Sequence, residues 1–174
     1  MKRNTIPDLI IDRIWLLDAQ MLRDLGVRAL IVDVDNTLSS HGAPLPEKEV
    51  IPWLARMNEL GVPVVILSNN TKERVEPFAG KLGLPFVHFA AKPLRRGFRR
   101  AQKLLSCPAR EIAVVGDQIF TDVVGGNRAG MKTVLVTPIK EDTDPWVLFK
   151  RRFEQRYIDL YYRKKGQKPL NRTK

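Results

Sequence analysis

The chain has 174 residues, of which 44% are hydrophobic and 28% charged, and it carries a formal net charge of +11. This length suits one compact domain with a short appendage, and the composition lies outside the disordered range. No apolar run approaches the roughly 18 residues that a membrane-spanning helix needs, and the basic N-terminus lacks the apolar core of a secretory signal. The single cysteine, Cys107, excludes an internal disulfide and a multi-cysteine zinc site, and it indicates a reducing, cytoplasmic compartment.

Positive charge is concentrated near the C-terminus. Residues 150–174 hold ten Lys or Arg residues against two acids, Glu154 and Asp159, and so contribute +8 of the net charge. A smaller basic cluster consists of Arg95, Arg96, Arg99, Arg100 and Lys103. The distribution predicts a domain of nearly balanced charge followed by a basic extension. That extension either meets an anionic partner, such as nucleic acid or a membrane surface, or is a solvated tail.

Apolar runs alternate with helical segments along the chain. The expected elements are, in chain order, a helix at 16–25, a strand at 29–34, a loop at 39–46, a helix at 46–61, a strand at 62–67, a helix at 71–82, a strand at 86–89, a helix at 94–105, a strand at 112–115, a helix at 122–129 and a strand at 132–136. This alternation predicts a three-layer α/β fold with a doubly wound, mostly parallel sheet. Active sites in such sheets lie outside the carboxyl ends of the strands, so chemistry is expected just after each apolar run.

Polar residues do follow the apolar runs. In chain order they are Asp33 and Asp35, then Ser68 and Asn69, then Lys92, and finally Asp117 and Asp122. Residues two apart on a strand point to the same face, so Asp33 and Asp35 could reach one pocket, where one attacks a phosphorus atom and the other moves a proton.

The remaining polar residues suit the same chemistry. Carboxylates gathered in one pocket repel each other and require a cation, and a set of oxygen ligands indicates Mg²⁺. Ser68 could donate a hydrogen bond to a phosphoryl oxygen, and Lys92 could neutralise charge on the phosphoryl group and on the attacking aspartate. The residues therefore predict a magnesium-dependent reaction on a phosphorylated substrate.

The set and order of these residues resemble the haloacid dehalogenase-like (HAD) phosphohydrolase superfamily over residues 29–137. The resemblance implies that Asp33 is the nucleophile and forms an aspartyl-phosphate. It implies that Asp35 is the general acid/base, which protonates the leaving alcohol and then activates water. Ser68 and Lys92 correspond to the second and third motifs of that superfamily.

The resemblance also implies a magnesium site. Asp117 and Asp122 would hold Mg²⁺ together with Asp33 and the backbone carbonyl of Asp35, with Asp122 reaching the ion directly or through water. Two further positions are candidates for the substrate-binding part of the site: Thr37, which closes the first motif and has a supporting structural role, and Asn69. A receiver domain also uses Asp, Ser/Thr and Lys on a doubly wound sheet, but it lacks the late Gly-Asp-x4-Asp pattern.

The finer resemblance is to the YqeG-type family of subfamily IIIA, which is similar to the mitochondrial phosphatidylglycerophosphate phosphatases. It is carried by residues 32–38, 68–70, 91–93 and 116–128. It implies a phosphatase, with phosphatidylglycerophosphate as a candidate substrate.

The spacing of the motifs leaves no room for a cap domain. Residues 38–68 hold a loop, one helix and one strand, and residues 69–92 hold one helix and one strand. An inserted domain would need about 50 residues. The pocket is therefore expected to be open, which favours large or surface-bound substrates. We expect a phosphatase domain at 1–140 and a basic, aromatic helix and tail at 141–174.

Within the C-terminal extension, apolar residues recur at offsets of three and four. They are Trp146, Phe149, Phe153, Tyr157, Leu160 and Tyr161. Two interpretations remain open. Residues 146–165 lie on anionic lipid at the inner membrane face, or the stripe packs on the domain while the basic residues face water. Residues 164–174 are expected to be disordered.

Two other functions fit parts of the sequence. A basic RNA- or ribosome-associated protein with a secondary phosphatase site would explain the net charge, although we find no recognisable RNA-binding motif. A protein phosphatase would use the open pocket to admit a phosphorylated loop. The lead hypothesis is a Mg²⁺-dependent phosphomonoesterase.

Overall fold

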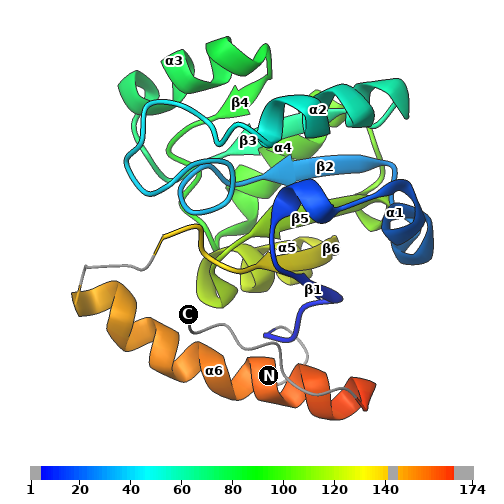
Figure 1. Ribbon diagram of the computed structural model, residues 1–174, viewed down its shortest axis with the longest axis vertical. Coiled ribbons are helices and arrows are strands. Elements are labelled where there is room, and N and C mark those ends of the chain that lie inside the picture. Colours follow the sequence, from blue (N-terminus) through cyan, green and yellow to red (C-terminus); the bar gives the residue numbers. More distant parts are fainter. Residues whose placement is uncertain (1–4, 141–144, 167–174) are drawn as a thin grey trace.

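The computed structural model of the protein describes residues 5–140 and 145–166, without the side chains of residues 146, 147 and 150. Six parallel strands form one sheet in the order β1-β6-β5-β2-β3-β4 (Figure 1). The strands are β1 (Leu9–Ile11), β2 (Ala29–Val32), β3 (Val64–Leu67), β4 (Phe86–Val87), β5 (Ile112–Gly116) and β6 (Lys132–Val136). The predicted α/β class with a doubly wound sheet is confirmed, and every strand pair is parallel.

Helices cover both faces of the sheet (Figure 1). They are η2 (Ile14–Leu16), α1 (Ala19–Leu25), α2 (Val50–Glu59), α3 (Lys72–Leu82), α4 (Arg95–Leu105), η3 (Ala109–Glu111), η4 (Ile119–Val123), α5 (Val124–Ala129) and α6 (Pro145–Lys165). Helices α1, α2 and α3 share one core with the sheet, and α4 packs on the opposite face beside α5. The three layers follow from strands that are apolar on both sides.

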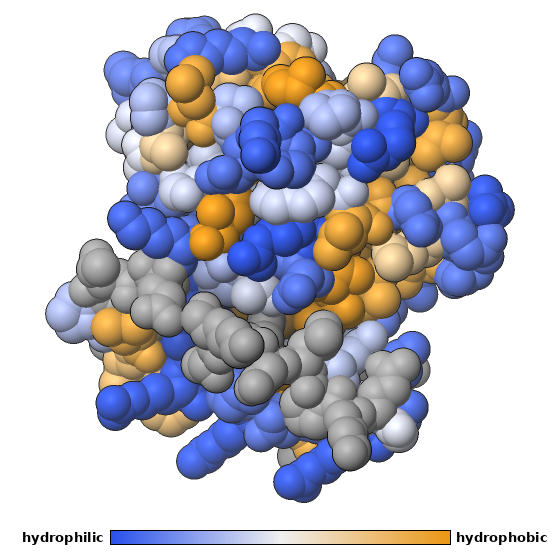
Figure 2. Space-filling model, in the orientation of Figure 1, coloured by the Kyte–Doolittle hydropathy of each residue, from blue (hydrophilic) through white to orange (hydrophobic). Residues whose placement is uncertain are grey.

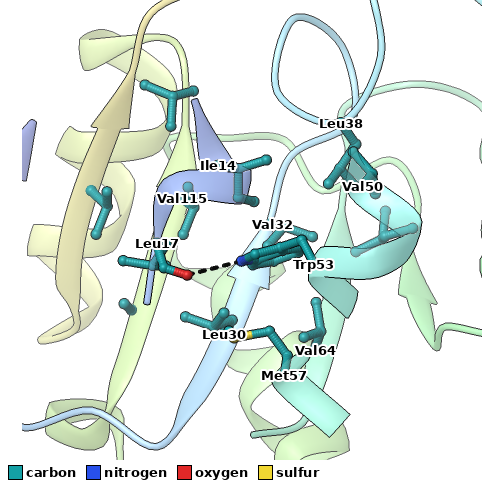
Figure 3. Close-up of a cluster of buried hydrophobic side chains, with 14 of the residues drawn as sticks. Ile14, Leu17, Leu30, Val32, Leu38, Val50, Trp53, Met57, Val64 and Val115 are labelled. Carbon is teal, nitrogen blue, oxygen red and sulfur yellow. Dashed lines mark hydrogen bonds between the residues drawn. The ribbon is translucent and has the colours of Figure 1, made fainter. Parts of the chain in front are cut away.

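The core beneath the site consists of buried apolar side chains on both faces of the sheet. Alternate residues of β2 enter opposite cores, because successive side chains of a strand point to opposite faces. On one side Leu30 and Val32 meet the fully buried Trp53 of α2 (Figure 3). The indole Nε1 of Trp53 donates a hydrogen bond to the backbone carbonyl of Leu17 at 3.1 Å, so this buried polar group has a partner (Figure 3). The strand that leads to the site is thereby fixed on both faces.

Several elements differ from the sequence-based expectation. The helix expected at 16–25 begins at Ala19, and the helix expected at 122–129 is divided between η4 and α5. Strand β1 was not expected, because three residues are too few to show a pattern, and it is completed by parallel pairing with β6. Helix α2 begins at Val50 rather than at residue 46. The carboxylate of Glu47 instead accepts hydrogen bonds from the Ser40 hydroxyl at 3.0 Å and the Ser40 amide at 3.3 Å. The four residues before Val50 therefore close the loop.

The apolar stripe of helix α6 packs on the domain along only part of its length. Ile158, Tyr161 and Tyr162 are buried in one cluster with residues of β1, η4 and β6. Near its other end Phe149 and Phe153 are 51% and 43% exposed. Figure 2 shows a hydrophobic patch near the start of the helix and hydrophilic side chains along its outer edge. Packing of the stripe thus holds for its C-terminal half, whereas the first half faces solvent.

Other expectations for this region fall partly outside the described residues. The side chain of Trp146 is not among those described, and neither are residues 167–174. Lys164 and Lys165, which were expected in a disordered tail, belong to the last turn of α6. Within the described ranges, no helix is long and apolar enough to cross a membrane.

Candidate active site

Most of the polar residues singled out in the sequence meet in one pocket at the carboxyl ends of the strands. The pocket has a volume of about 160 Å³. It is lined by Asp33, Asp35, Asn36, His41, Ser68, Asn69, Asn70, Lys92, Asp117, Gln118 and Thr121. Asp122 is not among the lining residues and is 1% exposed, but its carboxylate is ion-paired with the lining residue Lys92. Residues far apart in the chain converge here because parallel strands end at the same edge of the sheet.

The first two aspartates leave β2 in a tight turn. The amide of Asp33 donates to the Val115 carbonyl at 3.0 Å, which continues the ladder between β2 and β5 by one residue. Asn36 then takes a left-handed backbone conformation with φ 58°, which Asn tolerates better than most residues. Its amide donates to the Ser39 carbonyl at 2.7 Å and closes the turn. The backbone thus holds Asp33 and Asp35 at the carboxyl-terminal edge of the sheet.

Gly116 allows Asp122 to reach the same edge. A Cβ at position 116 would collide with the Asp122 carboxylate, so only glycine leaves room for it. The carboxylate accepts hydrogen bonds at 3.2 Å from the Gln118 amide and from the Thr121 hydroxyl. The Gly-Asp-x4-Asp spacing is therefore the spacing of a turn that folds Asp122 back onto the end of β5.

Lys92 is the cation at the centre of the site. Its side chain is 3% exposed, and its Nζ lies 2.8 Å from Asp33 Oδ1 and 2.7 Å from Asp122 Oδ1. The side chain of Asn69 holds the Lys92 backbone from both sides, since Oδ1 accepts from the amide at 2.7 Å and Nδ2 donates to the carbonyl at 3.3 Å. Asn69 lines the pocket and also positions Lys92.

Burial and crowding change the acidity of these groups. Burial raises the pKa of Asp33 to about 6, with the Asp122 carboxylate adding to the rise and the Lys92 ammonium opposing it. Burial likewise raises the pKa of Asp117 to about 7, against the Arg151 guanidinium. Burial disfavours the charge on Lys92, but the carboxylates of Asp122 and Asp33 outweigh it and raise the Lys92 pKa. The carboxylates carry more negative charge than one lysine balances.

Three carboxylates are arranged so that they could hold a metal ion. One oxygen from each of Asp33, Asp117 and Asp122 lies within 4.8 Å of the others. Asp117 Oδ1 is buried and has no hydrogen-bond partner in the described part of the chain. A buried carboxylate oxygen without a partner is costly, and a hard cation with oxygen ligands would satisfy it. The residues therefore fit a divalent cation such as Mg²⁺.

The carboxylate of Asp35 is not part of this cluster. It accepts hydrogen bonds from Asn70 Nδ2 at 2.5 Å and from the Gly42 amide at 2.9 Å, and Arg74 lies 3.4 Å away. The sequence suggested that all four carboxylates share one pocket with a cation. Asp35 lines the pocket but turns its carboxylate toward these donors, which leaves its backbone carbonyl as its candidate contact with a metal.

Of the two hydroxyl-bearing candidates, Ser68 lines the pocket and Thr37 does not. Ser68 is 1% exposed but lines the pocket, and its Oγ accepts a hydrogen bond from the Asn70 amide at 3.1 Å. Its hydroxyl hydrogen is thus available for another acceptor. Thr37 is 1% exposed and does not line the pocket. Its position favours the supporting role over direct contact with substrate.

Among the residues that were not predicted as site residues, four hold the carboxylates of Asp35 and Asp117 or the segment after Asp117. Asn70 and Arg74 hold the Asp35 carboxylate, and Arg151 and Glu154 reach the site from α6. Arg151 forms an ion pair with Asp117, and Glu154 is 3% exposed. A signal was present for the second pair. Glu154 is one of two acids among the basic residues 150–174, and an isolated acid three positions from an arginine indicates a specific contact.

Comparison with known proteins gives matches across most of the chain. A family model for HAD-hydrolase-like proteins matches residues 89–145. A Bacillus subtilis protein named "Probable phosphatase YqeG" is 35% identical over 164 residues, which cover 94% of this chain and 95% of that protein. Phosphatidylglycerophosphate phosphatase 1 of the Chlamydomonas reinhardtii chloroplast is 32% identical over 163 residues, covering 88% of this chain and 61% of that protein.

A solved structure shows the same fold at low sequence identity. It is the cobalt-bound form of deoxy-D-mannose-octulosonate 8-phosphate phosphatase from Haemophilus influenzae. The TM-score is 0.51 at 14% identity, and the match covers 79% of this chain and 90% of that chain. At this identity the likeness concerns the fold.

Proposed function

Because the chain belongs to the YqeG-type family of HAD-like phosphatases, we propose that it hydrolyses phosphomonoesters with Mg²⁺, through an aspartyl-phosphate on Asp33. The observation that carries this proposal is the buried Lys92, whose ammonium bridges Asp33 and Asp122 at the carboxyl ends of the strands. This arrangement keeps a nucleophilic carboxylate beside a fixed positive charge. It suits attack on a phosphoryl group, where charge on the transferred oxygens must be balanced.

The first chemical step forms the phosphoenzyme. A carboxylate oxygen of Asp33 attacks phosphorus, and the bond from phosphorus to the ester oxygen breaks. Asp35 in its acid form donates its proton to the leaving oxygen, which departs as an alcohol. Asn70, Gly42 and Arg74 hold the Asp35 carboxylate in place for this transfer.

The second step releases phosphate. Asp35, now a carboxylate, takes a proton from a water molecule as the water oxygen attacks phosphorus. The bond between phosphorus and the Asp33 oxygen breaks, which returns the Asp33 carboxylate and frees inorganic phosphate. Throughout, Lys92 balances charge on Asp33, and the Ser68 hydroxyl donates to a phosphoryl oxygen.

The metal site is assigned to Asp33, Asp117 and Asp122, with the backbone carbonyl of Asp35. The clustered oxygens of the three carboxylates and the unpartnered Asp117 Oδ1 support this assignment. When bound, Mg²⁺ supplies positive charge that neutralises the phosphoryl oxygens and the crowded carboxylates.

The finer proposal is that the substrate is a phospholipid, phosphatidylglycerophosphate. The activity in the name of the Chlamydomonas reinhardtii relative supports it. The chain adds a physical argument, because residues 38–68 and 69–92 insert no cap over the pocket. An uncovered site accommodates a headgroup that stays attached to a membrane.

Exposed apolar side chains near the site support membrane contact. Phe89 and Leu94, both 60% exposed, flank Lys92 along the chain between β4 and α4. The Phe89 amide donates to the carbonyl of the pocket residue Asn70 at 3.0 Å, so this loop borders the pocket. The first turn of α4 adds two exposed arginines, Arg95 and Arg96.

Helix α6 supplies a second surface of the same kind. Its first half exposes Leu148, Phe149 and Phe153, and basic side chains face solvent at Arg152 and Arg156. Apolar side chains beside cations are typical of a surface that binds anionic lipid. We propose that, within residues 146–165, the exposed first half of α6 binds the anionic inner face of the cytoplasmic membrane peripherally, while the second half stays packed on the domain.

The test is Mg²⁺-dependent phosphate release from three substrates. They are phosphatidylglycerophosphate in phosphatidylglycerol vesicles, a phosphopeptide, and para-nitrophenyl phosphate as a small soluble ester. We expect turnover of the soluble ester that is lost with a chelator, and faster turnover of the lipid. Turnover of the phosphopeptide alone would favour a protein phosphatase. Salt-dependent RNA binding without any phosphate release would favour the RNA-associated alternative.

A further inference from the structure

Helix α6 enters the proposed metal site through Arg151. The Arg151 guanidinium donates to the backbone carbonyl of Asp117 and also forms an ion pair with Asp117 Oδ2. The Arg151 side chain is 20% exposed and that of Asp117 is 1% exposed. One planar guanidinium therefore holds both the main chain and the side chain of a residue at the base of the pocket. A fork of this kind fixes orientation as well as charge.

Glu154 holds Arg151 in turn. Its Oε2 lies 3.2 Å from Arg151 Nη1, and Glu154 is one turn further along the same helix. Its other oxygen, Oε1, accepts hydrogen bonds from the amides of Ile119 at 2.7 Å and Phe120 at 3.4 Å. These amides lie at the start of η4, the turn that carries Asp122. Arg151 and Glu154 thus fasten α6 to the start and the middle of the segment 117–122, which supplies two proposed metal ligands.

The two oxygens of Asp117 have different environments. Oδ2 is held by Arg151, whereas Oδ1 is buried and has no hydrogen-bond partner within residues 5–140 and 145–166. We propose that Arg151 is a positioning residue, an inference that rests on the metal site of the proposed function. This arginine holds Asp117 by Oδ2 and the backbone so that Oδ1 remains for the cation, and Glu154 fixes Arg151. In metal sites, partners of the ligands typically change affinity by about 10–100-fold.

This assignment makes α6 part of the active site. Packing alone would need only the buried residues near its far end, Ile158, Tyr161 and Tyr162. The Arg151 and Glu154 contacts are polar, buried or partly buried, and directed at the proposed ligand segment. The alternative is that the guanidinium occupies the place of the cation and must leave before metal binds. The two ideas predict opposite effects of removing Arg151.

The experiment is a calorimetric titration of the metal-stripped, full-length protein with magnesium chloride. Arg151→Gln is expected to weaken Mg²⁺ binding by about 10-fold or more. Arg151→Lys keeps the charge without the planar fork and should fall between this variant and the wild type. Arg152→Gln is the matched control, because it removes the same charge from the adjacent exposed position and should leave the affinity unchanged.

Circular dichroism and thermal unfolding without metal establish that each variant is folded. If Arg151→Gln does not fold, the same comparison is made with Arg151→Lys against Arg152→Lys. Equal affinity of the wild type and the folded Arg151 variant would overturn the positioning role, and tighter binding by the variant would show competition with the cation. Wild-type protein that binds no Mg²⁺ would overturn the proposed metal site and this inference with it.

Discussion

Two regions meet at Asp117: the sheet, whose strand ends carry the carboxylates, and helix α6, which carries Arg151. In the sheet, Asp33 and Asp117 are placed by strands buried on both faces, as Val32 leads to Asp33 and Gly116 to Asp117. In α6, the exposed apolar residues and the pair Arg151 and Glu154 share the same two turns. The sheet positions groups by its backbone ladder, whereas α6 does so by a few side-chain contacts.

The two regions differ in how many side-chain substitutions each can accept before the geometry of the site is lost. The strand ends are fixed by backbone hydrogen bonds that side-chain substitutions do not remove. Near the pocket, the attachment of α6 to the domain depends on the Arg151 guanidinium and the Glu154 carboxylate. Substitutions in the sheet region should therefore act on chemistry, and substitutions in α6 on metal binding and membrane contact.

The largest effect is expected where the sheet supplies the nucleophile. Asp33→Asn removes the attacking carboxylate and should lower turnover of para-nitrophenyl phosphate by about 10³-fold or more. Thermal unfolding should show an intact fold, because the strand and its ladder remain. Asp24→Asn is a matched control, since Asp24 is exposed on α1. Retained turnover in Asp33→Asn would contradict the assignment of the nucleophile.

Lys92→Met tests the central cation of the sheet region and should affect both activity and stability. It leaves Asp33 and Asp122 buried without their shared counter-charge, which typically costs about 3–5 kcal/mol. Denaturant unfolding without metal should show this loss, and magnesium chloride should restore part of it. Stability equal to the wild type in the absence of metal would show that the ammonium does not balance these carboxylates.

The order of motifs at strand ends was sufficient to predict the pocket. Asp33, Lys92 and Asp117 each follow an apolar run, and parallel topology brings such positions together without knowledge of side-chain packing. Arg151 could not be placed in this way. Arg151 lies on a helix that follows the last strand, and not at the end of a strand. Periodicity identifies the apolar stripe of that helix but not the groups that its arginines contact. Strand β1 was missed for a related reason, since a three-residue strand depends on its partner β6.

A smaller effect is expected from the residues that hold Asp35. Asn70→Ala removes the hydrogen bond at 2.5 Å to the Asp35 carboxylate but leaves the contacts from Gly42 and Arg74. Turnover should fall about 10-fold, through less exact placement of the acid/base. The decrease should appear in kcat rather than in Mg²⁺ affinity. A change confined to Mg²⁺ affinity would place Asp35 in the metal site through its carboxylate.

The smallest effect on chemistry is expected from the exposed apolar residues of α6. Phe149→Ser combined with Phe153→Ser should leave turnover of the soluble ester unchanged and lower sedimentation with phosphatidylglycerol vesicles several-fold. Leu60→Ser combined with Leu104→Ser is the control, because these side chains are equally exposed near the C-terminal ends of α2 and α4. Equal vesicle binding by both double variants would contradict membrane contact through α6.

The most direct test of the central claim is to trap the phosphoenzyme. Wild-type protein turning over para-nitrophenyl phosphate with Mg²⁺ is quenched in acid, digested and mapped by mass spectrometry. We predict a phosphate adduct on the peptide that contains Asp33 and no adduct on that peptide in Asp33→Asn. Turnover without an adduct on that peptide, or an adduct on another residue, would contradict an active site in which the end of β2 supplies the nucleophile.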